Sequence, residues 1–335
     1  MKVSFAKVIA EIGVNHNGSF KRAVKLIKAA KFAGAHFVKF QIFKTENLVL
    51  KNTRKANYQT KNDKSANQYQ MLKKFELTNK DFKRIINFCK KIKIKFLATP
   101  FDLESVDFLK RNKLEYIKIS SADINNYPLL KKIGSNRKKV LLSTGMATIK
   151  EINYAIKTLV DGGTKRKNIT IFHCTSSYPT PLEDVNLNVL KTFKKKFGMN
   201  IGYSDHTNSI IIPSFALMLG AKFIEKHITL NNNDVGPDHK ASLNYKNFKL
   251  MIKIIKDLEI SLGSGLKKIT KSEKINLKYI RRSIYAKKNI KKGDIFSSSN
   301  IITKRPSTGL SPVKWNKLIG KVSKRNFLKD EKIKI

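Results

Sequence analysis

The sequence predicts an α/β fold, a (β/α)₈ barrel of the TIM-barrel type followed by a small β-rich domain. Short apolar runs alternate with amphipathic stretches from Val3 to about Leu262, which is typical of βα units around a parallel sheet. Eight such apolar runs occur, enough to close a barrel. Beyond them the chain becomes polar and lysine-rich, and then breaks into short strand-like pieces separated by glycines.

The eight predicted strands are short runs rich in Ile, Val, Leu and Phe. They span residues 7–12, 36–42, 95–99, 116–120, 139–144, 169–175, 200–204 and 222–228. Helix signals lie between them: Ser19 can cap a helix that ends at Gly34, and Thr148 with Glu151 forms a capping box for a helix that stops near Gly162. A long amphipathic helix is expected from Tyr245 to Leu262, and the polar insertion 51–70 is expected to be a loop over the site.

These patterns divide the chain into three parts. Residues 1–262 are expected to form the barrel, residues 263–280 a linker, and residues 281–335 the small β-rich domain. Gly293, Gly309 and Gly320 separate the short pieces of this last part.

Composition narrows the possible partners and surroundings. The formal net charge is +45, but the lysines are spread along every segment and no nucleic-acid-reading motif accompanies them, so we expect solvated lysine faces and no nucleic-acid partner. No apolar run approaches the roughly 18 residues that span a bilayer, and no membrane partner is expected. Cys89 and Cys174 form neither a disulfide framework nor a CxxC pattern, which favours the cytoplasm.

Polar residues stand at the carboxyl ends of nearly all predicted strands, where barrel enzymes carry their active sites. Because strand side chains alternate with period two, Lys39 shares a face with Gln41, and Glu225 shares one with His227. The others at strand ends are Glu11, Thr99, Lys118, Ser120, Ser121, Ser143, His173, Thr175, Asp205 and His206.

Two interpretations of these side chains stay open. Lys39 and Lys118 lie in apolar strands, where an unpaired ammonium is costly, so they would suit a phosphate and a carboxylate; alternatively, they extend past the barrel rim. His206 and His227 could bind a transition metal, but no HExxH-type motif supports this, and a lone histidine near a strand end is more often a hydrogen-bonded core residue.

The order of the motifs is more specific than any one of them. They are EIGVNHNGS (11–19), VKFQIFK (38–44), ATPFD (98–102), NNYPLL (125–130), LSTGMAT (142–148), HCTSSYPTPLEDVNLN (173–188), IGYSDHT (201–207), FIEKHITL (223–230) and GPDHKAS (236–242). Over essentially the whole chain this series resembles the N-acetylneuraminate (sialic acid) synthase family. The tail, with KRPSTGLSP and WNKLIGK, resembles the family's SAF domain, which is related to type III antifreeze proteins.

The resemblance implies roles for these residues. Glu11 matches the catalytic carboxylate, and His206 and His227 match ligands of a divalent metal, manganese above all, with magnesium or cobalt as alternatives. Phosphoenolpyruvate would lie near Lys39, Lys118, Ser121 and Ser143, with Gln41 and Thr99 close by. The sugar would meet Ser176, Tyr178 and Asp238, and Arg305 would reach it from the partner subunit of a domain-swapped homodimer.

The expected activity is that of an N-acetylneuraminate synthase, which condenses phosphoenolpyruvate with N-acetylmannosamine, or a related N-acyl amino-hexose, and water. Three departures concern the sugar: Ser176 stands where neuraminate enzymes often have Asn, Asp123 where Glu is usual, and Ser307 where the tail usually has Gly. Legionaminate or pseudaminate synthesis is therefore the near alternative. A 3-deoxy-sugar acid synthase would lack the tail domain, and a non-catalytic protein that binds anionic polymers would not need Glu11 with both histidines.

Overall fold

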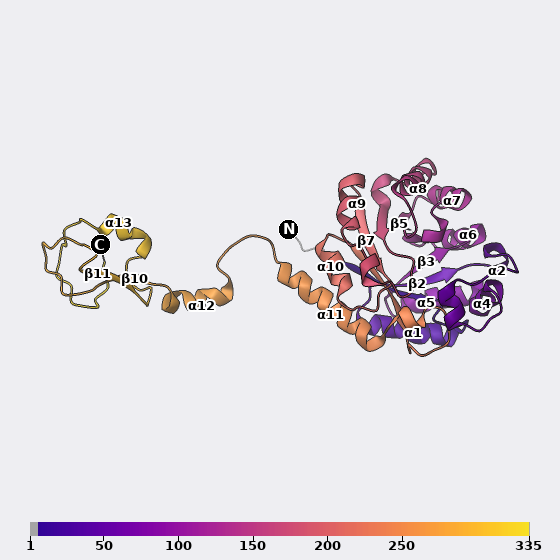
Figure 1. The fold of residues 1–335 in the computed structure, drawn as a ribbon, viewed down its shortest axis with the longest axis horizontal. Coiled ribbons are helices and arrows are strands. Elements are labelled where there is room, and N and C mark those ends of the chain that lie inside the picture. The colour runs from indigo at the N-terminus through magenta and orange to yellow at the C-terminus, as the bar shows by residue number, and fades with distance from the viewer. Residues whose placement is uncertain (1–5, 335) are drawn as a thin grey trace. The chain divides into compact units, whose positions relative to one another are not determined.

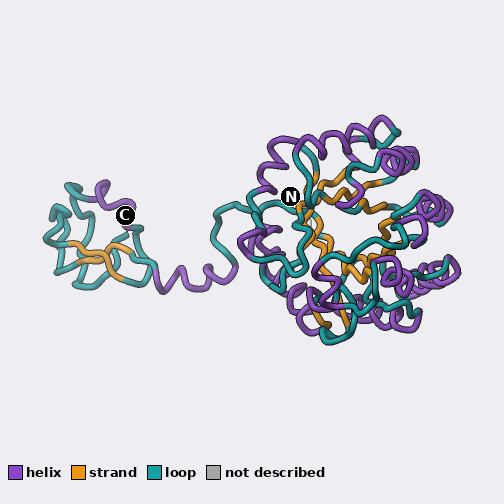
Figure 2. The backbone as a smooth tube through the Cα atoms, turned by 45° about the vertical axis from the view of Figure 1, so that its right-hand side comes forward, coloured by secondary structure: helices purple, strands orange, loops and turns teal. Residues whose placement is uncertain are grey.

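The computed structural model describes residues 6–334, and the chain divides into two compact units between Ser264 and Gly265. The first unit is a barrel of parallel strands surrounded by helices (Figures 1 and 2). Its strands are β1 (Lys7–Gly13), β2 (Phe37–Ile42), β3 (Lys95–Pro100), β4 (Tyr116–Ile119), β5 (Lys139–Ser143), β6 (Ile169–His173), β7 (Asn200–Asp205) and β8 (Phe223–Thr229). Each predicted strand is therefore confirmed to within two residues at either end.

The strands follow one another around the barrel in the order β3-β2-β1-β8-β7-β6-β5-β4. β3 and β4 stand at the two ends of this order and contact each other, so the barrel is nearly closed. A short strand, β9 (Leu243–Asn244), continues the sheet beside β8. The parallel ladders carry all eight carboxyl ends to the same mouth of the barrel.

Helices cover the outside of the barrel. They are α1 (Phe20–Ala33), α5 (Asn79–Lys91), α6 (Leu103–Arg111), α7 (Tyr127–Ser135), α8 (Ile149–Asp161), α9 (Val189–Phe197), α10 (Ile212–Met218) and α11 (Tyr245–Leu262). The side-chain oxygen of Ser19 accepts from Arg22 N and starts α1, which ends at Gly34 with φ 98°, as the sequence predicts. The predicted capping box of Thr148 and Glu151 starts α8. No helix within residues 6–334 is long and apolar enough to cross a membrane.

The insertion between β2 and β3 is helical, although the sequence predicts a loop for residues 51–70. It contains α2 (Thr45–Leu48), α3 (Asn57–Asn62) and α4 (Gln68–Phe75). Met71 and Phe75 are buried against Val14 and Phe43, which anchors this polar segment to the barrel mouth. The sparse apolar residues of the segment carry the packing, and they are too few to give a clear helical period in the sequence.

The inside of the barrel has two layers. The amino-terminal layer is apolar and consists of Ile9, Phe37, Leu97, Tyr116, Leu141, Phe172 and Phe223. Two residues further along their strands come Glu11, Lys39, Thr99, Lys118, Ser143 and Glu225, so the same inward face becomes polar toward the mouth. The strand period alone therefore places a charged layer on top of an aromatic floor.

The second unit has its own small core. A helix, α12 (Lys271–Ile280), lies within the stretch that the sequence predicts as a linker, and β10 (Ser283–Ala286) pairs antiparallel with β11 (Ile301–Lys304). A short helix, α13 (Trp315–Leu318), follows. The buried side chains are Ile284, Ala286, Ile290, Phe296, Ile301, Leu318, Phe327 and Ile333.

Candidate active site

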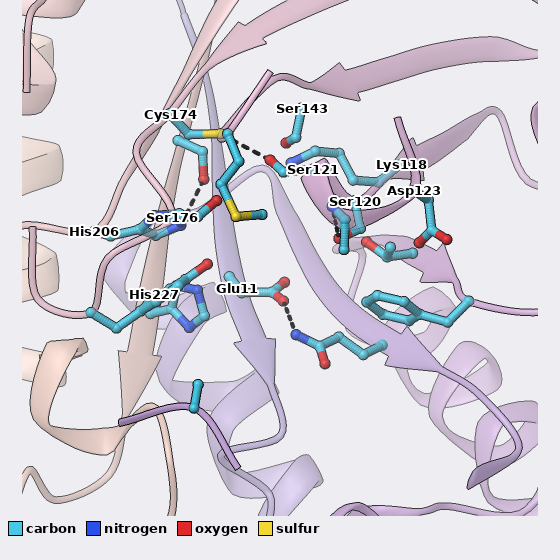
Figure 3. A pocket seen from close by; sticks show the side chains of 18 of the residues that line it. Glu11, Lys118, Ser120, Ser121, Asp123, Ser143, Cys174, Ser176, His206 and His227 are labelled. Atoms are coloured by element: carbon cyan, nitrogen blue, oxygen red, sulfur yellow. Dashed lines mark hydrogen bonds between the residues drawn. The ribbon is translucent and has the colours of Figure 1, made fainter. Parts of the chain in front are cut away.

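A cavity of about 620 Å³ opens at the carboxyl ends of the strands. Of the residues singled out from the sequence, those that line it are Glu11, Lys39, Gln41, Thr99, Lys118, Ser120, Ser121, Asp123, Ser143, Ser176, Tyr178, His206, Glu225 and His227. In the view of Figure 3 the two histidines lie on one side of Glu11, with Lys118 and Ser121 on the other. The cavity thus has a basic and hydroxyl-rich side and an imidazole side.

Glu225 joins the two lysines of the basic side. Its Oε2 lies 2.6 Å from Nζ of Lys118, and its Oε1 lies 3.2 Å from Nζ of Lys39 and accepts from Ser204 Oγ at 2.9 Å. Only 6% of Lys39 and 1% of Lys118 is exposed, so the interpretation that these lysines extend past the rim does not hold. Burial alone would raise the pKa of Glu225, but the lysines outweigh it and hold that pKa well below its usual range.

Glu11 is the second buried carboxylate. Its Oε2 lies 3.4 Å from Nζ of Lys39, and its Oε1 accepts from Gln41 Nε2 at 3.4 Å. Burial raises the pKa of Glu11 to about 7 against the opposing attraction of Lys39. A carboxyl group with a pKa near the working pH can both take up and release a proton, as a general base requires.

A bulge in β1 makes room for this carboxylate. The ladder with β2 shifts between Glu11 and Gly13, and Gly13 has φ 51°. A Cβ at Gly13 would lie 3.2 Å from Glu11 Oε1 and 3.5 Å from Asp238 Oδ2. The motif glycine thus permits both the left-handed backbone and the close approach of two acidic side chains.

The tautomer of His206 follows from its contacts. Its Nδ1 lies 2.7 Å from the carbonyl oxygen of Thr175, which can only accept, so Nδ1 carries the proton. Its Nε2 lies 3.3 Å from Ser204 Oγ, whose single proton is already directed at Glu225. Burial lowers the pKa of His206 to about 4, so the ring is neutral and Nε2 retains a lone pair that faces the cavity.

His227 is buried beside it, with ring centroids 5.5 Å apart. Burial lowers its pKa well below the usual range, and its Nδ1 has no hydrogen-bond partner among the described residues; Asp238 Oδ2 is 3.7 Å away. A buried ring nitrogen without a partner, next to a second neutral imidazole, suits a divalent transition metal. No group of three or more His, Cys, Asp or Glu side chains in residues 6–334 could hold a metal. The two imidazoles would need oxygen ligands from water or substrate.

Hydroxyl groups complete the basic side. Ser121 Oγ accepts from the main-chain N–H of Gly145 at 2.9 Å and lies 3.3 Å from Cys174 Sγ. Ser143 lines the same part of the cavity. Together with the two ammonium groups, these donors can surround a small anion.

An aromatic stack forms the opposite wall. The ring of Tyr178 lies 4.2 Å from that of His206, and the ring of Tyr58, from α3, lies 5.2 Å from that of Tyr178. Leu48 and Leu72, from α2 and α4, extend this wall, which also includes Val49, Ala56, Gln59 and Gln68. The helical insertion therefore supplies an apolar surface with two side-chain amides.

The sequence interpretation left some lining residues out of the site. The period of two places Glu225 on the face of His227 without assigning it a role, and the same period places Ser204 on the inward face of His206. Tyr58 comes from the insertion and gives no periodic signal. Asp238, expected to meet the sugar, is not among the residues that line the cavity; its Oδ2 lies 3.7 Å from His227 Nδ1, and burial raises its pKa to about 6. Arg305 is an exposed residue of the second unit.

Fold and site together define a class: a barrel protein with a basic, hydroxyl-rich pocket that can accept a small anion beside a pair of neutral imidazoles. Among solved structures, the N-acetylneuraminic acid synthetase of Leptospira borgpetersenii in complex with citrate is similar, with TM-score 0.72 and 31% identity over 82% of this chain and 91% of that one. The NeuB family model matches residues 26–267, and the SAF domain model matches residues 281–334.

Two curated relatives from Campylobacter jejuni extend over nearly the whole chain. The N,N'-diacetyllegionaminic acid synthase is 48% identical, covering 98% of each chain. The pseudaminic acid synthase is 35% identical, covering 96% of this chain and 93% of its own. The chain belongs to the NeuB family of nonulosonic acid synthases and carries a SAF domain.

Proposed function

We propose that the chain condenses phosphoenolpyruvate with a diacetamido-hexose and water to give N,N'-diacetyllegionaminic acid and phosphate. Support comes from the Campylobacter legionaminic acid synthase, which is 48% identical, whereas the pseudaminic acid synthase is 35% identical. These relatives favour the alternative activity over the expected use of N-acetylmannosamine. Phosphoenolpyruvate contains no nitrogen, so both acetamido groups of such a product must come from the hexose.

The wall formed by the insertion supports this substrate. A second acetamido group replaces a hydroxyl by a methyl-bearing amide, which is larger and less polar. Leu48 and Leu72 offer apolar contacts for the methyl group. Nε2 of Gln59 gives one proton to Tyr58 and has a second that can be donated to an acyl oxygen. A sugar with one acetamido group would leave part of this wall in water.

The charged layer carries the proposal. Lys39 and Lys118 are held within ion-pair distance of one carboxylate, Glu225, deep in the barrel. Phosphoenolpyruvate contains both a phosphate and a carboxylate. The two ammonium groups and the nearby hydroxyl groups can bind these anionic groups, because the donors are already in place in the cavity. Burial lowers the pKa of both lysines and Glu225 opposes this effect, so the pKa of Lys39 is raised above its usual value while that of Lys118 stays below it. The carboxylate also holds both ammonium groups in place before the anion arrives.

The reaction then balances as follows. The electron pair of the phosphoenolpyruvate double bond forms a bond from C3 to the aldehyde carbon of the open-chain sugar, whose oxygen takes up a proton and becomes a hydroxyl. Water adds to C2 and loses one proton to Glu11, which balances the proton taken up by the aldehyde oxygen. The C2–O bond to phosphate then breaks as the new C2 hydroxyl gives its remaining proton to the departing phosphate, which leaves the keto acid. A divalent cation held by His206 and His227, manganese with magnesium or cobalt as alternatives, would supply Lewis-acid polarisation of the aldehyde oxygen.

Product analysis tests this function. The purified protein is incubated with phosphoenolpyruvate, manganese and either a 2,4-diacetamido-hexose or N-acetylmannosamine, and phosphate release and product mass are measured. We expect turnover with the diacetamido sugar to exceed that with N-acetylmannosamine by at least about tenfold in kcat/KM, equivalent to about 1.4 kcal/mol. A preference for N-acetylmannosamine would return the assignment to neuraminate synthesis. A homodimer, a role for Arg305 across it and a cytoplasmic location stay predictions.

A further inference from the structure

Lys226 is a buried lysine that does not face the cavity. It stands between Glu225 and His227 on β8, so the strand alternation directs it outward, on the same face as the buried Ile224 and Ile228. Its side chain has 0% exposure. Nζ donates to Asp205 Oδ2 at 2.6 Å and to the main-chain oxygen of Thr207.

Asp205 is equally buried and accepts hydrogen bonds from the turn that follows β7. Its Oδ1 accepts from the main-chain N–H of Thr207 at 3.0 Å and from the hydroxyl of Tyr203 at 3.2 Å. Its Oδ2 accepts from Thr207 Oγ1 at 3.2 Å as well as from Lys226. The carboxylate thus has four donors from β7, its turn and β8, and every one of them comes from behind the cavity wall.

His206 lies between the two residues that this network holds. Asp205 precedes it and Thr207 follows it, and both are bonded to Lys226, which directly precedes His227. Asp205 and Lys226 are also partners in the ladder between β7 and β8. The main chains that carry the two imidazoles are therefore joined through one ammonium group.

Stability alone does not account for this pair. Removing two charges from water costs several kcal/mol per ion, and well-packed apolar residues of similar volume are often as stabilising or more so. Neither side chain lines the cavity, so neither contacts a substrate there. What the pair supplies that apolar residues cannot is a directional link between the turn and the strand.

We propose that Lys226 and Asp205 are positioning residues that set the placement of the His206 imidazole relative to that of His227 for a divalent cation. The proposal rests on the metal site of the proposed function. It assigns the pair no contact with substrate or metal: both act through the main chain on either side of His206.

The test compares metal affinity with stability in the full-length protein. Lys226→Met/Asp205→Leu replaces the ion pair by apolar side chains. Lys132→Met/Asp107→Leu is the control for the substitutions themselves, because that ion pair has the same 2.6 Å contact but is partly exposed and joins α6 to α7. Mn²⁺ binding is measured by electron paramagnetic resonance of the free ion, and unfolding by thermal melting. We expect the first variant to fold and to bind Mn²⁺ about ten- to hundredfold more weakly, with the control unchanged.

Thr207→Val provides a second test in case the double variant does not fold. It removes the Oγ1 bond to Asp205, together with the bond that Oγ1 accepts from the main-chain N–H of Ser209, while keeping the shape of the side chain. We expect severalfold weaker Mn²⁺ binding at a melting temperature within a few degrees of that of the wild type. Wild-type Mn²⁺ affinity in a folded Lys226→Met/Asp205→Leu variant, or in Thr207→Val if the double variant does not fold, would overturn the positioning role alone. A wild-type protein that binds no Mn²⁺ would overturn the metal site and the positioning role together.

Discussion

Nζ of Lys39 lies 3.4 Å from Oε2 of Glu11, and this cation is the main force that opposes the rise in the pKa of Glu11. Burial raises that pKa to about 7. The base is active only when ionised, so kcat/KM should rise with pH through about 7 and fall below it. Lys39→Met removes the opposing cation and raises the pKa of Glu11 further. The rising limb of the pH profile, where kcat/KM increases with pH, should therefore move to higher pH.

The pH profile of kcat/KM for the sugar, taken at saturating phosphoenolpyruvate, checks this expectation. Lys95→Met is the control, since Lys95 pairs with Glu115 at the opposite end of the barrel and should leave the limb in place. A limb that moves to lower pH in Lys39→Met would show that another group limits the rate.

Both histidines should be required for metal binding. His206→Ala or His227→Ala removes one of only two imidazoles in the cavity, so Mn²⁺ binding and turnover should be lost while the thermal unfolding transition is kept. His36→Gln changes an exposed imidazole outside the cavity and should behave as wild type in both assays. Near-normal activity of either alanine variant after chelation and return of manganese would contradict the metal assignment.

Loss of Lys118 should weaken the use of phosphoenolpyruvate more than that of the sugar. Lys118→Ala removes a charge-assisted contact worth about 1.5 to 3 kcal/mol, so KM for phosphoenolpyruvate should rise roughly ten- to hundredfold. It also leaves Glu225 with Lys39 as its remaining ion-pair partner among the described residues. Initial-rate kinetics with each substrate varied in turn decide the matter, with Lys222→Ala on the far side of the aromatic floor as control. A defect confined to the sugar would show that Lys118 does not hold the anion.

The wall of the insertion should select the sugar. Tyr58→Ala removes the outer ring of the stack on Tyr178 and should raise KM for the diacetamido-hexose several-fold while changing KM for phosphoenolpyruvate little. Tyr69→Ala, on α4 and outside the cavity lining, is the control. Equal loss for both substrates would indicate that Tyr58 supports the cavity as a whole instead of the sugar.

The sequence was sufficient for the barrel because strand period and capping signals are local. The eight strands, the Ser19 cap and the capping box at Thr148 depend on neighbouring residues and are confirmed. The pairing of Glu225 with Lys39 and Lys118 depends on closure, since β8, β2 and β4 approach across the barrel only once it forms. Tyr58 reaches the cavity through the packing of the insertion, which no local pattern specifies.

The aromatic floor has a consequence for the order of events. Tyr116 and Phe223 line a separate basic cavity at the other end of the barrel and do not line the candidate site. Small molecules therefore cannot pass along the barrel axis, and they must enter and leave the candidate site through the same mouth. The lysines stand directly above this floor, whereas the wall of the insertion surrounds the mouth, so a sugar seated against that wall covers the anion beneath it. Under the proposed function, phosphoenolpyruvate would therefore enter before the sugar, and phosphate would leave only after the sugar acid has moved away from the wall.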